Sequence, residues 1–421
     1  MWVVLLAALL ALANARPGPQ TPSRSGAQVL RVVPQTDAQL HYLQGLLSLD
    51  LYDFWTEPKM TGRSVDIMVS AWSVPVLKKT LNDIGMGFIT MIRDLAQHSA
   101  QAKASNKAAR AKFFATKDAN VKHDMDWTSY HTLDEINGYL DYLATTYPDL
   151  CSIENIGTSY EGRTMNMLKI STGGSGKPGL FIDGGIHARE WIAPATVTYA
   201  INQLVESGSY QDILDAVDFY IIPSINPDGY VYSWEHDRYW RKTRSNYGTL
   251  CYGCDPNRNW SFHWDEIGAS DNPCSEIYAG PSPFSEIEMV NVRDAMSAQS
   301  NLISYLTFHS YSQLWMYPWG FTTDLPEDWQ DLDNLASDAV DALTAVHGTH
   351  YEIGSSTNTI YAAAGGSDDW AKGEGGVKYA YTIELRDTGN WGFDLPENQI
   401  IPTGEETWAG IEVVARFVAT Q

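Results

Sequence analysis

Long hydrophobic runs are missing from this 421-residue chain beyond its first fifteen residues. No later segment has the roughly 18 uninterrupted apolar residues of a transmembrane helix, which argues against an integral membrane protein. The opening run, MWVVLLAALLALANA, is too short for a membrane span and ends in the small-x-small triplet Ala13-Asn14-Ala15. Residues 1–15 are therefore predicted to be a signal peptide, and the protein to be secreted and extracellular.

Cysteine is scarce: the chain has four, Cys151, Cys251, Cys254 and Cys274. An oxidising compartment permits disulfides, but four cysteines allow three full pairings and the sequence alone does not choose among them. Cys251 and Cys254 form a C-x-x-C, yet a matching second pair is missing, which argues against a zinc ribbon.

Basic residues are few in the larger part of the chain. Residues 118–421 contain 15 Lys and Arg against 44 Asp and Glu, whereas residues 1–117 contain 13 against 7, and the whole chain has a net charge of −23. An acidic body argues against nucleic acid as a partner, because phosphate binding needs a basic surface. The basic front segment and the acidic body are expected to attract each other.

The front segment is predicted to be a small α/β unit followed by a helix. Apolar patterns over residues 28–92 indicate the order βαββαβ, an open sandwich of an antiparallel sheet and two helices. Residues 93–117 lack Gly and Pro and are rich in Ala, which predicts a helix that continues into a connector. Its basic residues, expected to be exposed, are Lys103, Lys107, Arg110, Lys112 and Lys117. Such a connector is open to a trypsin-like protease, and we expect cleavage near Lys117.

From about residue 118, apolar strands alternate with helices. This alternation predicts an α/β fold, with a mostly parallel sheet covered by helices on both faces. Ligand sites in such sheets lie beyond the carboxyl ends of the strands. Four polar residues, His187, Asn226, His309 and Glu384, fall at or just past the end of an apolar strand.

The stretch GGIHAREW, residues 184–191, follows one of these strands and places His187 and Glu190 three residues apart. Imidazole nitrogens and carboxylate oxygens are good zinc ligands, and a short turn lets both face one point. His309 ends another strand and is a candidate third ligand. Two histidines and one carboxylate with a vacant fourth position form the catalytic zinc pattern. Taken singly, the pair could be surface charges and His309 a histidine satisfied by its neighbours.

Seven motifs occur along the chain: HAREWIAP, INPDGY, WRKTRS, DPNRNW, HSYSQ, IYAAAGGSDDW and IELRDTG. In this order they resemble the pancreatic-type zinc carboxypeptidases of the A/B subfamily, and residues 28–117 resemble that family's activation segment. The resemblance implies an eight-stranded mixed sheet with flanking helices, and one Zn²⁺ held by His187, Glu190 and His309. It also implies a division into signal peptide (1–15), activation prosegment (16–117, with a globular part 28–92 and a connecting helix 93–117) and catalytic domain (118–421).

The resemblance assigns roles to further residues. Glu384 matches the general base that takes a proton from water, and Arg241 matches the residue that stabilises the developing oxyanion. The positions matching substrate-binding residues are Arg189, Asn257, Arg258, Tyr311 and Tyr361, of which Asn257 and Arg258 form the clamp for the terminal carboxylate. Without the motifs, Glu384 would be interpreted as a partner of Arg386.

Residues near these positions carry further expectations. Lys242 and Arg244, beside Arg241, are expected to be solvated. Cys251 and Cys274 match the common disulfide of the family. The state of Cys151 and Cys254 stays open, as does an exchange of Cys251 for Cys254.

Substrate preference depends on Asp368, the first Asp of AGGSDDW, which matches the base of the pocket for the departing side chain. An apolar residue there suits aromatic or aliphatic ends, as in the A type. An aspartate suits Lys and Arg, as in the B type, because a buried cation needs a counter-charge. The alternative is that Asp368 points to water while Asp369 holds a structural contact.

We therefore predict a secreted zymogen of a B-type zinc carboxypeptidase. Its expected partners are peptide and protein C-termini as substrates, its own prosegment as an intramolecular inhibitor, and an activating trypsin-like protease. One alternative is an A-type enzyme. The other is a catalytically inactive binding relative, against which the intact ligand and base positions argue.

Overall fold

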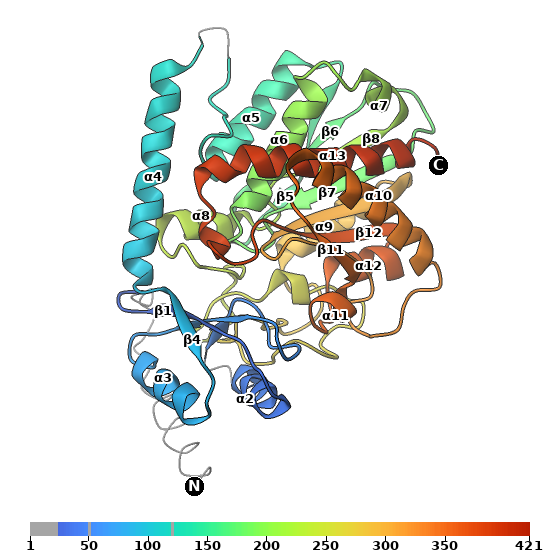
Figure 1. Ribbon diagram of the computed structural model, residues 1–421. Coiled ribbons are helices and arrows are strands. Elements are labelled where there is room, and N and C mark those ends of the chain that lie inside the picture. The colour runs from blue at the N-terminus through green and yellow to red at the C-terminus, as the bar shows by residue number, and fades with distance from the viewer. Residues whose placement is uncertain (1–23, 49–51, 119–121) are drawn as a thin grey trace. The chain divides into compact units, whose positions relative to one another are not determined.

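The computed structural model describes residues 24–48, 52–118 and 122–421 (Figure 1). The predicted signal peptide lies outside the described residues. The chain divides into two compact units, residues 24–100 with 246–251, and residues 101–245 with 252–421, and each is described by itself. Within the described ranges, no helix has the length and apolar character needed to cross a membrane.

The first unit has the predicted order βαββαβ. Its elements are β1 (Gln28–Val32), α2 (Asp37–Ser48), β2 (Asp53–Phe54), β3 (Val65–Val69), α3 (Val74–Asp83) and β4 (Phe88–Ile92). The strands form an antiparallel sheet in the order β2-β3-β1-β4. Leu77 and Leu81 of α3 pack with the buried strand residues Leu30 and Ile67 in one core, so the apolar alternation that predicted the strands also gives the buried face. β2 is the shortest of the four strands, with two residues.

Helix α4 (Leu95–Thr116) continues past residue 100, and its later part belongs to the second unit. Lys107 and Lys112 are exposed, as expected. The expectation is wrong for the other three basic residues, which are partly buried and bind neighbours. Lys103 Nζ donates to the carbonyl of Trp234 (2.7 Å), Arg110 binds Glu135, and Lys117 pairs with Asp124 (2.6 Å).

The second unit is built on an eight-stranded mixed sheet. Its strands are β5 (Cys151–Thr158), β6 (Thr164–Ile170), β7 (Gly179–Gly184), β8 (Asp218–Ile222), β9 (Leu302–Ser310), β10 (Leu314–Tyr317), β11 (Glu352–Ser355) and β12 (Tyr379–Leu385). They are ordered β11-β10-β12-β9-β7-β8-β6-β5, and the run β12-β9-β7-β8 is parallel. β10 and β11 also pair in parallel, while the other neighbours are antiparallel. The predicted mixed, mostly parallel α/β sheet is confirmed.

Helices cover both faces of this sheet, because successive strand residues point to opposite sides. The helices are α5 (Leu133–Thr146), α6 (Ile192–Val205), α7 (Gln211–Ala216), α8 (Pro227–Glu235), α9 (Ile287–Ser297), α10 (Trp329–His347), α11 (Ser356–Thr359), α12 (Ser367–Gly373) and α13 (Ile400–Val418). Helices α6, α10 and α13 lie side by side on one face (Figure 1). Residues of α9 and α12 contribute to a second core with the alternate strand residues, such as Phe181 and Tyr305.

The cysteines are resolved by the structure. Cys251 and Cys274 are both disulfide-bonded, in agreement with the disulfide that the resemblance implied. Cys151 and Cys254 are free thiols and both are buried, so they do not pair with each other.

Candidate metal centre

The turn after β7 carries the two residues of the motif GGIHAREW that could bind a metal. β7 ends at Gly184, and Gly185 has a φ of +66°, a conformation that favours glycine. A Cβ at Gly185 would also lie 3.0 Å from Pro194. The backbone therefore turns sharply where the parallel strand ends, and His187 and Glu190 follow within one short loop.

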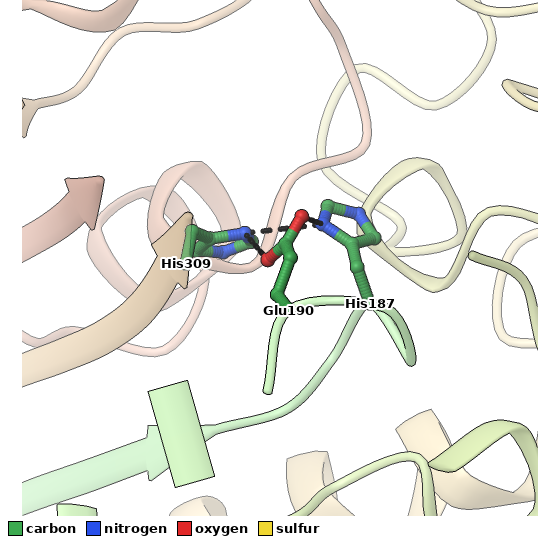
Figure 2. Close-up of side chains that lie close together, drawn as sticks. All are labelled: His187, Glu190 and His309. Atoms are coloured by element: carbon green, nitrogen blue, oxygen red, sulfur yellow. Dashed lines mark hydrogen bonds and ion pairs between the residues drawn. The ribbon is translucent and has the colours of Figure 1, made fainter. Parts of the chain in front are cut away.

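Three side chains from two distant segments meet at this turn (Figure 2). His187 Nδ1 lies 2.8 Å from Glu190 Oε1, and His309 Nδ1 lies 3.3 Å from Glu190 Oε2. The two Nδ1 atoms are 3.2 Å apart. All three residues are at most 4% exposed, and their ligand atoms lie within 4.8 Å of one another. Of the described residues, this is the one group of His, Cys, Asp and Glu that could hold a metal ion.

A histidine nitrogen can bind a metal only when it carries no proton, so the position of the ring proton of His187 matters. His187 Nε2 lies 3.1 Å from Asp255 Oδ1, and a carboxylate there accepts the Nε2 proton. His187 Nδ1 is then unprotonated and faces Glu190. Burial raises the pKa of Glu190, but the neighbouring His187 and His309 have the larger combined effect and hold this pKa below its usual range. The carboxylate of Glu190 is therefore charged. Two imidazole nitrogens and a carboxylate facing one point fit a zinc ion.

Asp255 is a functional residue that the sequence reasoning missed. Its Oδ2 accepts hydrogen bonds from Arg241 Nε (3.1 Å) and Nη2 (2.8 Å), and its Oδ1 accepts from the backbone N–H of Asn257 (2.9 Å). One buried carboxylate thus orients a metal ligand, the predicted oxyanion residue and the start of the predicted carboxylate clamp. The available signal was its place directly before Pro-Asn-Arg in the motif DPNRNW.

Glu384 lies beside His309 in the sheet, because the β9–β12 register pairs these two residues. Its Oε2 is buried and has no hydrogen-bond partner among the described residues. Burial and the nearby Glu190 raise the pKa of Glu384 to about 8, against the opposing effects of His309 and Arg241. The alternative pairing with Arg386 is not made, since Arg386 Nε donates to Glu406 Oε1 (2.7 Å).

Asn257 and Arg258 follow Asp255 in a short 3₁₀ helix (Pro256–Arg258). Arg258 is 2% exposed. Its Nε donates to the carbonyl of Gly268 (2.7 Å) and its Nη1 to that of Asn257 (3.0 Å), while Nη2 is buried with no partner within the described ranges. The ring of Tyr361 lies 5.8 Å from the Arg258 guanidinium carbon. Arg258 therefore keeps one donor for a ligand, with Tyr361 beside it.

Asp368 and Asp369 begin α12 and have different surroundings. Asp369 accepts hydrogen bonds from the backbone N–H groups of Gly320 (2.9 Å) and Phe321 (3.2 Å), so it holds a structural contact. Asp368 is 5% exposed, which rules out the alternative that it points to water. The hydroxyl of Ser356 lies 3.4 Å from its Oδ2, and burial raises the pKa of Asp368.

Arg189 and Tyr311 are both buried and meet at one ring. The Arg189 guanidinium lies over Phe393, 4.3 Å from the ring centroid, and the ring of Tyr311 packs on Phe393 edge to face at 5.1 Å. Sequence reasoning missed Phe393, which has no charge or motif to mark it. The structure thus brings these two predicted residues together.

Two expectations about polar residues near the site are wrong. Lys242 is buried and donates to the carbonyl of Pro273 (2.8 Å), and Arg244 stacks on Tyr232 with its guanidinium 3.7 Å from the ring centroid. Asn226 is not a ligand but caps α8, with its Oδ1 accepting from the N–H of Gly229 (3.0 Å). Its Nδ2 donates to the carbonyl of Ile186 (3.0 Å), which supports the turn just before His187.

Comparisons with known proteins agree with this geometry. The family model described as zinc carboxypeptidase matches residues 136–410, and the carboxypeptidase activation peptide matches residues 30–101. Carboxypeptidase B of Astacus astacus is 73% identical over 298 residues, which are 70% of this chain and 98% of that protein. Carboxypeptidase A1 of Mus musculus is 40% identical over 92% of each chain. The crystal structure of carboxypeptidase A from Helicoverpa armigera aligns with a TM-score of 0.87 at 28% identity, over 94% of this chain and 98% of that one.

Proposed function

The chain belongs to the zinc carboxypeptidase family and carries its activation peptide, and we propose that the mature enzyme removes lysine or arginine from the C-termini of peptides. The observation that supports this proposal is that the carboxylate of Asp368 is buried. Isolated buried charges are costly, and a side-chain partner of this carboxylate among the described residues is the neutral hydroxyl of Ser356. A basic side chain in the pocket would supply the missing positive charge. The relative named carboxypeptidase B supports the same preference.

The chemistry at the scissile bond is divided between the metal and Glu384. His187, Glu190 and His309 would hold a zinc ion, and that ion would supply Lewis acidity, which lowers the pKa of water and polarises a carbonyl group. Glu384, with one oxygen free of partners, accepts a proton from the attacking water and delivers it to the departing amine. Its raised pKa suits a group that must take up and release a proton near neutral pH.

Arginine side chains handle the negative charges of the reaction. Arg241 is held by Asp255 and donates to the carbonyl oxygen as negative charge develops on it. Arg258 offers Nη2 to the terminal carboxylate, and Asn257 adds a neutral donor. Arg189 and Tyr311 contact the substrate further from its end, and Tyr361 closes over the bound residue.

The domain boundaries and the activation step are part of the proposal. Residues 1–15 act as a signal peptide for secretion, residues 16–117 as the inhibitory prosegment, and residues 118–421 as the catalytic domain. A trypsin-like protease cuts near Lys117, which follows the last residue of α4. The pairing of Lys117 with Asp124 must open before cleavage.

The proposed preference is tested with matched peptides that end in Arg or Phe. After tryptic maturation, the wild-type chain should prefer the Arg-ended peptide, and a chelator should abolish both activities. Asp368→Leu should lower kcat/KM for the Arg-ended peptide by at least 100-fold, since a buried cation left unpaired costs about 3–5 kcal/mol. The same variant should retain or gain activity on the Phe-ended peptide.

A charge-matched control separates the pocket from the general acidity of the surface. Asp338 is exposed on α10, and Asp338→Leu should leave the Arg-to-Phe ratio unchanged. A wild-type enzyme that prefers the Phe-ended peptide would favour the A-type alternative. A matured chain that binds zinc but cleaves neither peptide would favour the inactive binding relative.

A further inference from the structure

A row of buried polar side chains crosses the sheet directly below the metal centre. The strand register places Asp183 of β7 opposite Thr307 of β9, and Thr307 opposite Thr382 of β12. Two residues further along, on the same face, β9 carries His309 and β12 carries Glu384. The polar row and the metal row are therefore adjacent, and both belong to the parallel centre of the sheet, where strand residues are normally apolar.

Asp183 is the acidic residue of this row, and burying its carboxylate costs free energy. It is fully buried, and the partners of its carboxylate within the described part of the chain are two neutral hydroxyl groups. Its Oδ2 accepts from the hydroxyl of Tyr305 (2.7 Å) and its Oδ1 from that of Thr307 (2.7 Å). Burial raises the pKa of Asp183 to about 6, even though these two hydrogen bonds lower it. A charged group in such a place needs a compensating interaction.

The hydroxyl of Thr307 connects Asp183 to the metal centre. Thr307 Oγ1 lies 2.7 Å from Asp183 Oδ1 and 3.4 Å from His309 Nε2. A hydroxyl has one hydrogen, and an ionised carboxylate can only accept, so that hydrogen goes to Asp183. Toward His309 the oxygen of Thr307 then acts as an acceptor, and the proton of the ring lies on Nε2. His309 Nδ1, which faces His187 and Glu190, is left unprotonated.

We propose that Asp183 is a positioning residue for the metal ligand His309 and acts through Thr307. The pair fixes the ring orientation and the tautomer of His309, as Asp255 does directly for His187. The negative charge of Asp183 also complements the positive charge of the bound metal across one side chain. This inference rests on the zinc site of the proposed function.

The experiment measures zinc affinity in the full-length chain. The test variant is Thr307→Val, which keeps the shape of the side chain and removes the hydroxyl. The matched control is Tyr305→Phe, which removes the other hydrogen bond to Asp183 but contacts no metal ligand. Zinc dissociation constants are obtained by competition with a chelator, and the absorption spectrum of the cobalt-substituted chain reports the ligand field. Asp183→Asn is measured alongside.

Thr307→Val should raise the zinc dissociation constant about 10-fold or more and alter the cobalt spectrum. Tyr305→Phe should stay within twofold of wild type in affinity and keep its spectrum. If Asp183→Asn does not fold, the comparison of the first two variants still decides. Equal affinity and an identical spectrum for Thr307→Val and wild type would overturn the inference, as would an equal loss in Tyr305→Phe. A wild-type chain that binds no zinc would overturn the proposed function as well, so the two failures differ.

Discussion

Asn106 tests how firmly the second half of α4 is held against the rest of the second unit, to which it belongs. This side chain is 3% exposed, its Nδ2 donates to the carbonyl of Tyr130 (3.0 Å), and its Oδ1 accepts from the N–H of Tyr130 (2.6 Å). Asn106→Leu keeps the volume and removes both bonds. Each buried group left without a partner costs about 1–3 kcal/mol. When the second half of α4 separates from its neighbours, water can bind the two backbone groups of Tyr130. We therefore expect the free energy that holds this part of the helix in place to fall by about 2 kcal/mol. This change makes the separated, undocked state roughly 30-fold more populated.

Hydrogen exchange of the amides of residues 101–116, resolved by mass spectrometry, measures this change. Exchange through the undocked state should accelerate roughly 30-fold in Asn106→Leu, while the amides of the central strand β9 should be unaffected. Lys107→Ala is the control, because Lys107 is the exposed neighbour and alanine keeps the helix. Equal exchange of α4 in Asn106→Leu and wild type would refute the assignment of Asn106 as a docking residue.

Three further outcomes are expected. Glu384→Gln should lower kcat by about 10²–10⁴-fold, with zinc content measured by atomic absorption unchanged, because it removes the proton acceptor and no ligand. Arg258→Met should lower kcat/KM for a free-carboxylate peptide by at least about 30-fold, and an equal rate in both enzymes would contradict the clamp. The melting temperature should fall as well, because the carbonyls of Gly268 and Asn257 lose their donor. The third outcome concerns the acid stability that Glu135 provides. Burial raises the pKa of Glu135, but His131, the N–H of Thr132 and Arg110 together lower it more. The resulting pKa is about 2, against an ordinary value of 4.5. A depressed carboxylate pKa adds stability that is present above the ordinary value and lost as the pH falls toward 2. Glu135→Gln should therefore flatten the acid decline of the melting temperature between about pH 4.5 and 2, and an unchanged slope would contradict the assignment.

Local patterning predicted the strands and helices that carry long apolar repeats. The six elements of the first unit and the central strands β7, β9 and β12 follow from alternation or from continuous apolar runs. β10 and β11 were missed because four-residue strands carry too little pattern to distinguish them from loops. α8 was missed because its beginning, Asn226-Pro227-Asp228-Gly229, has the composition of a turn, whereas Asn226 caps a helix there.

The metal ligands could be predicted to different degrees. His187 and Glu190 lie three residues apart in one turn, so their proximity follows from the sequence. His309 is more than a hundred residues away. Its place at the end of another apolar strand made it a candidate, and the resemblance of motifs then connected it to the other two. Asp255 and Asp183 were missed, because a hydrogen bond to the outer nitrogen of a histidine depends on strand register and loop packing. Lys242 and Arg244 were expected in solvent, since an aromatic stack or a distant carbonyl partner leaves no local signal.

Asp368 and Asp369, the neighbouring aspartates at the start of α12, make different contacts. Asp369 accepts hydrogen bonds from the backbone N–H groups of residues 320 and 321, whereas the Asp368 carboxylate contacts the hydroxyl of Ser356. The anchoring of this helix is therefore independent of the side chain at position 368. A single exchange there could retune which terminal residue is accepted while the scaffold beneath it stays in place.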